Sequence, residues 1–338
     1  MSAGNSDILC LNRICSSGRL SYGIVDGNEY ARRAVNRVID ISPNLKLLDP
    51  QIPIPAYNRF IGSYLVLGER NAIVDPGPAS ARPGLLSAVE ESGLRPEDIR
   101  YIVLTHIHVD HAGGVGAIMP DFPNATVLAH SRARPHLIDP TALWNASLKV
   151  LGELALKYGP MEPVPADRIA EAADRMLIDL GGTRLEVYLT PGHAVHHLSL
   201  FDRDTGILIA GEAAGVCVNG VIRPATPPPF KLEETVASID RLIELEPQKI
   251  CYGHFGCYDS GLERLRHYRE KLFFWQEVIR SETARGRGID DMLPLLKEKD
   301  RDLDYLDVLN RDEYARELVL LNNSILGMAG TANRPPAR

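Results

Sequence analysis

The chain has 338 residues, of which 45% are hydrophobic and 24% charged, and its formal net charge is −7. This length allows one large domain or two of average size, with a sizeable core. The acidic balance argues against a nucleic-acid-binding protein, because such proteins usually carry a basic excess or stripe. No apolar run reaches the about 18 residues of a membrane span, so we expect neither nucleic acid nor membrane as a partner.

The cysteines and the N-terminal residues indicate the compartment. Residues 1–7 lack the basic and then apolar stretches of a secretory signal. The cysteines form an odd and sparse set, which is typical of reduced thiols in the cytoplasm; they are Cys10, Cys15, Cys217, Cys251 and Cys257. We therefore expect a soluble, cytoplasmic protein.

The chain begins with its least regular part. We treat residues 1–44 as an N-terminal extension with a short helix at residues 30–39, and we expect a strand at residues 44–48. The apolar runs at residues 63–67 and 71–75 are separated by a short turn that contains glycine, and this pattern predicts a β-hairpin.

Helical and strand patterns then alternate. Residues 85–92 have helical spacing, and the continuous apolar run at residues 101–104 is typical of a buried strand. Residues 126–129 predict a short strand, and residues 143–158 predict one amphipathic helix that ends at a Gly-Pro pair. Residues 184–189 alternate strictly between apolar and other side chains, as a half-buried strand does.

A second hairpin, a helix and a strand complete this part of the chain. Residues 198–201 and 207–210 predict the hairpin, residues 232–245 the helix and residues 249–252 the strand. Interleaved strands and helices predict an α/β core, which we place at residues 45–260.

Only helical patterns follow the core. We predict a helical region at residues 261–329 that packs on the core, because its apolar spacing requires burial. A disordered tail is expected at residues 330–338. The helical region, which contains Phe273, Phe274 and Trp275, either covers the functional site or forms a homodimer contact.

Three of the ten histidines lie in one short segment, which reads His106-x-His108-x-Asp110-His111. The segment directly follows the apolar strand at residues 101–104, so its side chains can converge at the end of that strand. Imidazole and carboxylate groups together favour zinc, iron or manganese over calcium or magnesium. A chance match to this pattern is rare, and the segment therefore predicts a metal site.

Two more histidines follow strand ends. His193 follows the alternating strand in Thr-Pro-Gly-His, and His254 follows a later strand in Tyr-Gly-His. Ligands of α/β proteins gather at this edge of the sheet. His197 does not follow a strand end in this way, and it is a candidate to orient a metal ligand.

Together these segments resemble the metallo-β-lactamase fold superfamily of hydrolases, and most closely its glyoxalase-II-like and lactonase-like group. The resemblance covers roughly residues 45–260 and rests, in chain order, on Asp75-Pro76-Gly77, the segment from Thr105 to His111, Thr190-Pro191-Gly192-His193, Ala210-Gly211-Glu212 and Tyr252-Gly253-His254. It implies an α/β fold of the αββα four-layer type with a C-terminal helical extension. A two-metal site is then expected at one edge.

The resemblance also implies which residues bind the metals. One metal is held by His106, His108 and His193, and the other by Asp110, His111 and His254. Asp75 and His197 are expected to hold the ligands in place. The cofactors are then two divalent metal ions, with zinc expected first and iron or manganese as alternatives.

Glu212 departs from the family pattern. The family usually has an aspartate here that bridges both metals, and glutamate is one methylene longer. Three roles stay open for Glu212: it bridges the two metals, it binds one of them, or it binds neither.

These ligands predict a metal-dependent hydrolase. A divalent metal lowers the pKa of bound water, and a second metal polarises the substrate oxygen. Asp110 is the expected catalytic residue, because it can hold a metal and also accept or orient the water proton. We expect hydrolysis of an ester, thioester or lactone bond in a small-molecule substrate.

Two other functions stay open. A mononuclear iron oxidoreductase of the persulfide dioxygenase type uses a similar histidine segment, whereas a low-activity effector would bind metal and a partner. One observation argues against a lactonase: no tyrosine follows Glu212 within twenty residues, where some lactonases place a phenol that stabilises the oxyanion.

Overall fold

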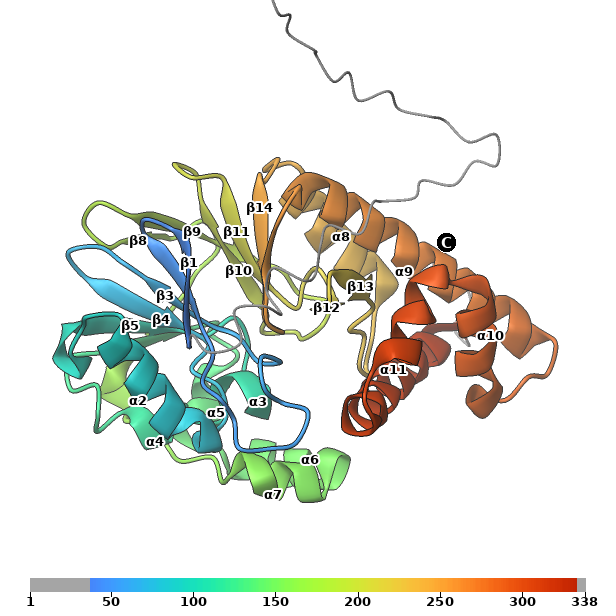
Figure 1. The fold of residues 1–338 in the computed structure, drawn as a ribbon, viewed down its shortest axis with the longest axis horizontal. Helices are drawn as coiled ribbons and strands as arrows, with labels where there is room; N and C mark the ends of the chain where they lie inside the picture. Colours follow the sequence, from blue (N-terminus) through green and yellow to red (C-terminus); the bar gives the residue numbers. More distant parts are fainter. Residues whose placement is uncertain (1–36, 333–338) are drawn as a thin grey trace, which may run out of the picture. The chain divides into compact units, whose positions relative to one another are not determined.

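Two β-sheets form the centre of the computed structural model, which describes residues 37–332 (Figure 1). The first sheet has seven strands in chain order: β1 (Val38–Ser42), β2 (Leu45–Leu48), β3 (Ser63–Val66), β4 (Asn71–Val74), β5 (Ile99–Val103), β6 (Thr126–Ala129) and β7 (Ile169–Glu171). The second has the order β15-β14-β11-β10-β9-β8, from β8 (Leu177–Asp179), β9 (Arg184–Leu189), β10 (Leu198–Asp202), β11 (Ile207–Gly211), β14 (Lys249–Tyr252) and β15 (Cys257–Asp259). A separate hairpin contains β12 (Val216–Val218) and β13 (Val221–Arg223).

Helices cover the outer face of each sheet (Figure 1). The helices before β9 are α2 (Arg82–Glu91), α3 (Val109–Ala112), α4 (Val115–Ile118), α5 (Arg134–Ile138), α6 (Thr141–Leu151) and α7 (Glu153–Tyr158). The later helices are α8 (Leu232–Ile243), α9 (Gly261–Ala284), α10 (Met292–Lys299) and α11 (Arg311–Ala332). One hydrophobic core joins α2 and α4 to the first sheet, and another joins α8 and α9 to the second. The predicted α/β fold with αββα layers and C-terminal helices is therefore confirmed.

The two sheets pack on each other beside the turn that links β14 and β15. The hydroxyl of Tyr64 on β3 donates to the carbonyl oxygens of Tyr252 and Gly256 at 2.6 and 2.9 Å. Ile61 forms an isolated β-bridge with His254. These contacts bring the end of β14 against the first sheet, where the loops after β4 and β5 also lie.

Parallel pairing brings the motif-bearing loops to one edge of the sheets. β4 pairs in parallel with β5, and β11 pairs in parallel with β14. Because the carboxyl ends of parallel strands lie at the same edge, the segments after β4 and β5 are neighbours, and so are the segments after β11 and β14. The sequence motifs containing Asp75, His106, Glu212 and His254 occupy these segments.

The structure differs from the sequence predictions near the N-terminal end of the first sheet and within the predicted helix at residues 143–158. The first sheet begins with β1, which pairs antiparallel with β2 and buries Ile39, inside the segment we assigned as an extension. The rest of that segment, including most of the predicted helix at residues 30–39, lies outside the described residues. The predicted helix at residues 143–158 is two helices, because Gly152 takes a φ of +57° between α6 and α7. A residue without a Cβ adopts this conformation at low cost, so the chain turns there.

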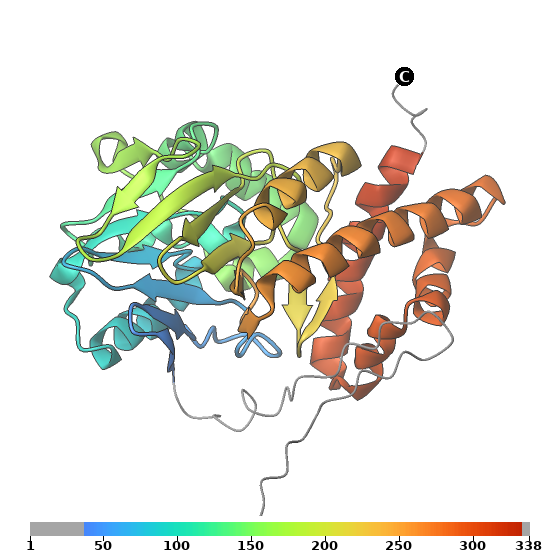
Figure 2. The same ribbon diagram turned by 90° about the horizontal axis from the view of Figure 1, so that it is seen from above.

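The C-terminal helices are continuous with the core of the second sheet (Figure 2). Leu265, Leu272 and Trp275 on α9 are fully buried, as are Leu321 and Ile325 on α11. α11 continues to residue 332, into the segment predicted as a tail, and residues 333–338 lie outside the described part. Among residues 37–332, no helix combines the length and apolar composition that a bilayer crossing requires. The three cysteines in this range are buried, and the Cys251 thiol donates to Cys257 Sγ at 2.7 Å.

Asp302 is expected to make the stability of the helical region depend on pH. Its carboxylate lies 2.9 Å from His267 Nε2 and 2.6 Å from Lys271 Nζ, and these two partners lower its pKa below the usual 3.8. A lowered folded-state pKa stabilises the protein above the unfolded pKa, and this contribution is lost as the pH falls toward the folded value. Asp302→Asn should therefore lower the free energy of unfolding by about 1 kcal/mol at pH 7, because the pair is partly exposed.

Urea unfolding of both proteins between pH 7 and pH 3 measures this contribution. The difference between native and Asp302→Asn protein should shrink below about pH 4. A difference that stays constant over this range would contradict the assignment.

Candidate metal centre

The histidine segment folds as a loop that enters the short helix α3. Asp75, which follows β4, accepts a hydrogen bond from the Thr105 backbone N–H at 2.7 Å and another from the Thr105 hydroxyl at 2.6 Å. Thr105 directly precedes His106, so these two bonds fix the start of the loop. Asp75 itself has a φ of +52°, a left-handed conformation in which its carboxylate turns toward the loop.

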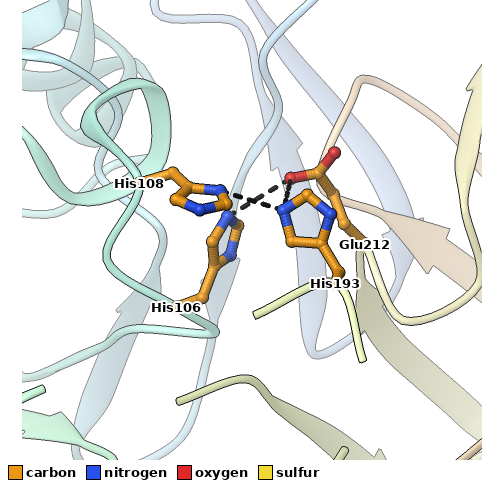
Figure 3. Close-up of side chains that lie close together, drawn as sticks. All are labelled: His106, His108, His193 and Glu212. Carbon is orange, nitrogen blue, oxygen red and sulfur yellow. Dashed lines mark hydrogen bonds and ion pairs between the residues drawn. The ribbon is translucent and has the colours of Figure 1, made fainter. Parts of the chain in front are cut away.

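Three histidines and a glutamate form the first cluster of metal-binding groups (Figure 3). One ligand atom from each of His106, His108, His193 and Glu212 lies within 4.8 Å of the others. His193 Nε2 is 2.9 Å from His108 Nδ1 and 2.8 Å from Glu212 Oε2, and His106 Nε2 is 3.2 Å from the same oxygen. The four side chains thus point at one another from the ends of β5, β9 and β11.

A second cluster lies directly beside the first. Ligand atoms of Asp110, His111 and His254 also lie within 4.8 Å of one another. His111 Nε2 is 3.6 Å and His254 Nε2 is 3.8 Å from Asp110 Oδ2. The six ligands that the resemblance implied are therefore gathered in two groups of three.

Glu212 lies between the two clusters. Its Oε2 faces His106 and His193, and it is also 3.5 Å from His111 Nε2. Its Oε1 is 3.2 Å from His254 Nε2. Both oxygens of this buried carboxylate thus reach ligand atoms, and between them they reach both clusters.

His197 fixes the backbone at Glu212. Its Nε2 accepts a hydrogen bond from the Glu212 backbone N–H at 3.1 Å, so its Nδ1–H is free to donate to Thr190 Oγ1 at 2.9 Å. Gly211 has a φ of +57°, and a Cβ at this position would lie 2.7 Å from His197 Nε2. Glycine is therefore required for the close approach of this loop to His197.

A backbone carbonyl orients His193. The Nδ1–H of this ring donates to the carbonyl oxygen of Ala225 at 2.9 Å. This contact fixes the tautomer and leaves Nε2, the atom that faces Glu212 and His108, available to a metal.

Several buried nitrogen atoms in the two clusters have no hydrogen-bond partner. Within residues 37–332 these atoms include His106 Nε2, His111 Nδ1 and Nε2, and His254 Nδ1. A buried polar atom without a partner costs about 1 to 3 kcal/mol of stability. Imidazole nitrogens beside carboxylates suit zinc, iron or manganese, so these residues fit a bound transition metal.

Comparison with known proteins agrees with this arrangement. Residues 58–254 match the family model described as the metallo-beta-lactamase superfamily. The chain belongs to this superfamily. The predicted resemblance is thus confirmed, and the matched segment contains both clusters.

Relatives within the metallo-β-lactamase superfamily match more than half of the chain. The metallo-beta-lactamase fold-containing protein ST1585 of Sulfurisphaera tokodaii is 34% identical over 198 residues, which are 57% of this chain and 72% of the relative. A hydroxyacylglutathione hydrolase of Xylella fastidiosa is 30% identical over 204 residues, or 60% of this chain and 62% of the relative. The crystal structure of protein TTHA1429 from Thermus thermophilus has a TM-score of 0.59 at 26% identity and covers 72% of this chain and 83% of that one.

The pKa shifts at the metallo-β-lactamase site favour binding of a cation. Burial and the neighbouring His193 lower the pKa of His108 to about 4, so its imidazole is neutral near pH 7. Burial opposes ionisation of Glu212, but His193 and His254 outweigh it and lower the pKa of this carboxyl well below 4.5. Burial also opposes protonation of His111, yet Asp110, Asp75 and Glu212 raise its pKa to about 10. The carboxylates of Asp110, Asp75 and Glu212 thus give the site a negative potential, which favours binding of a cation.

The structure adds residues that the sequence did not single out. The rings of Tyr57 and Tyr158 meet edge to face with centroids 5.7 Å apart. The Tyr57 ring also meets the Phe60 ring edge to face with centroids 5.3 Å apart, and burial raises the pKa of both phenols. The Phe60 ring centroid is 4.4 Å from that of His254. Tyr57 and Phe60 lie in an irregular segment, where no periodic pattern marks them, and Tyr158 is the last residue of the helix predicted at residues 143–158.

Proposed function

We propose that the protein is a metal-dependent hydrolase that cleaves an ester, thioester or lactone bond of a small molecule at a dinuclear site. His106, His108 and His193 would hold one metal, and Asp110, His111 and His254 the other. Glu212 would bridge them. The observation that carries this proposal is the position of the Glu212 carboxylate, whose two oxygens face different clusters.

The residues of this chain have distinct parts in such a reaction. When bound, divalent metals lower the pKa of water and polarise the bond under attack. Asp110, whose side chain is 20% exposed, has a carboxylate available to accept or orient the proton of the attacking water. Asp75 and His197 hold the loop and the Glu212 backbone, so that the ligands need little rearrangement.

The second cluster favours two metals over one. A mononuclear iron oxidoreductase would use the first cluster and leave His111 and His254 without a ligand role. Both ring nitrogens of His111 are buried and lack hydrogen-bond partners, and His254 Nε2 faces the carboxylates of Asp110 and Glu212, which supports a second ion there. Zinc fits this donor set, and iron and manganese fit it as well.

The tyrosine pair that packs on Phe60 keeps a lactone among the proposed substrates. The lack of a tyrosine after Glu212 argued against a lactonase, but Tyr57 and Tyr158 supply phenols from other segments, and Tyr57 packs on Phe60, which packs on His254. Similarity to a hydroxyacylglutathione hydrolase favours an acyl compound as substrate. We therefore propose acyl esters, thioesters and lactones as one group.

A reconstitution experiment tests the proposal. The metal-free protein is loaded with zinc, manganese or ferrous iron, and its metal content and its activity on chromogenic esters, thioesters and lactones are measured. We expect two metals per chain and hydrolysis of at least one substrate class. One iron per chain with oxygen uptake on a persulfide would instead support the oxidoreductase, and two bound metals without turnover would support an effector.

A further inference from the structure

The C-terminal helix α11 reaches the candidate metal centre although it lies outside the segment that matches the family model. In Figure 2 it runs beside the β12–β13 hairpin, which follows Glu212 in the chain. A buried ion pair between Arg223 on β13 and Glu317 on α11 joins these elements. The Tyr305 hydroxyl donates to the same glutamate at 2.6 Å. α11 is thus fixed against the segment that leads to Ala225.

Ser324 on α11 holds the residues on both sides of Ala225. Its hydroxyl donates to the Pro224 carbonyl oxygen at 2.9 Å, and the Leu320 carbonyl oxygen of its own helix lies slightly farther away at 3.1 Å. The Thr226 hydroxyl donates to the Ser324 carbonyl oxygen at 3.0 Å, and the Thr226 N–H lies 3.4 Å from Ser324 Oγ. The Ala225 carbonyl, which accepts from His193 Nδ1, is therefore held from α11.

Gly327 sets the distance between α11 and this segment. A Cβ at residue 327 would lie 1.8 Å from the Thr226 carbonyl oxygen. No side chain fits in this space, so the helix backbone can approach only because glycine is present.

Arg316 on α11 acts on the opposite side of the site. Its guanidinium lies 3.7 Å from the Phe60 ring centroid and donates to the Ala56 carbonyl oxygen. The Phe60 ring packs on His254, and the Phe60 carbonyl accepts from the Phe255 N–H at 2.8 Å. Arg316 therefore fixes the surface against which His254 rests.

We infer that α11 is part of the metal centre and positions one ligand in each cluster. Ser324 and Gly327 position His193 through the Ala225 carbonyl, and Arg316 positions His254 through the Phe60 ring. This inference rests on the proposed dinuclear site. Groups that orient a metal ligand typically change metal affinity by 10- to 100-fold when they are removed.

Ser324→Ala tests whether Ser324 positions His193 through the Ala225 carbonyl, with Ser281→Ala as a matched control. Ser281 is also a helix serine of the C-terminal region, and its hydroxyl donates to the Val278 carbonyl oxygen at 3.1 Å. In the metal-free protein, NMR of the His193 ring should show a shifted Nδ1–H signal in Ser324→Ala and the native signal in Ser281→Ala. In stepwise cobalt titration, Ser324→Ala should bind one of the two ions about tenfold more weakly.

Thr226→Val approaches the same contact from the other side and keeps the shape of the residue. It removes only the hydroxyl that donates to Ser324, so it should give the same direction of change if Ser324→Ala fails to fold.

Arg316→Lys should weaken the other ion and alter the His254 ring signal, whereas Arg280→Lys on α9 should alter neither.

The outcomes separate the inference from the proposed function. If native protein binds no cobalt, the dinuclear site fails, and the His193 signal of the metal-free protein still tests the α11 contact. If native protein binds two ions, but Ser324→Ala and Thr226→Val match Ser281→Ala in both measurements, the inference is wrong. Equal weakening of both ions by Ser324→Ala would also overturn it.

Discussion

Replacing His106 with alanine is expected to remove the metal of the first cluster and nearly all activity. The His106 Nε2 atom is buried, has no hydrogen-bond partner and faces Glu212 Oε2 at 3.2 Å. Its loss leaves His108 and His193 as the only imidazoles of this cluster, and two imidazoles with a shared carboxylate form a weak site. The expected loss in kcat/KM exceeds about 100-fold, the upper range for residues that only orient a ligand.

Metal analysis of the purified variants checks this expectation. His106→Ala should retain at most the metal of the second cluster, and His136→Ala, which changes an exposed histidine on α5, should keep the native content. Folding should survive, because His106 belongs to neither of the two hydrophobic cores. A native metal content in His106→Ala would refute the ligand assignment.

Glu212→Gln is expected to weaken binding of the second metal and to slow the reaction on the order of 100-fold, a size typical of a lost electrostatic contact at a reacting centre. The substitution keeps the size of the side chain but removes the negative charge that lies between the clusters. Two dications held close together then repel each other with less compensation. Metal stoichiometry and rates of both proteins in one buffer measure the effect.

Glu212→Asp tests whether Glu212 is a functional or an impaired bridge between two metals. The aspartate carboxylate would be set back by about 1.5 Å, one C–C bond length. Since Oε2 is 2.8 Å from His193 and Oε1 is 3.2 Å from His254, the shorter side chain loses contact with one cluster. We therefore expect partial activity. An Asp variant that exceeds the native protein would mean that Glu212 is an impaired bridge, and equal metal content and rate in all three proteins would remove it from the ligand set.

The positions of the histidine and carboxylate motifs could be predicted from the sequence because each follows a strand with a strong apolar pattern. The run at residues 101–104 and the alternation at residues 184–189 mark strand ends, and the histidines come directly after them. Parallel pairing of β11 with β14 then brings Glu212 to His254. Residues at strand ends can thus be located from the apolar pattern of the sequence.

The contacts that hold the ligands could not be predicted in the same way. Ala225 contributes a backbone carbonyl, which leaves no signal in residue type. Arg316 binds the Ala56 carbonyl across 260 residues of sequence, and helical periodicity shows which face is apolar but not what it meets. The segment around Phe60 has positive φ angles at Gln51, Ala56 and Arg59, so it follows no regular pattern.

The helix pair α6–α7 has a consequence for local motion. α6 contains no buried residue, and Val150 and Leu156 are 68% and 65% exposed, whereas Tyr158 at the end of α7 is buried beside the second cluster. Little apolar area is lost when α6 detaches, so its opening free energy lies far below that of the sheets. Amide protons in α6 then exchange with solvent well before those of β11. This outer helix therefore opens more readily than the sheets, and sequence changes in it have little effect on global stability.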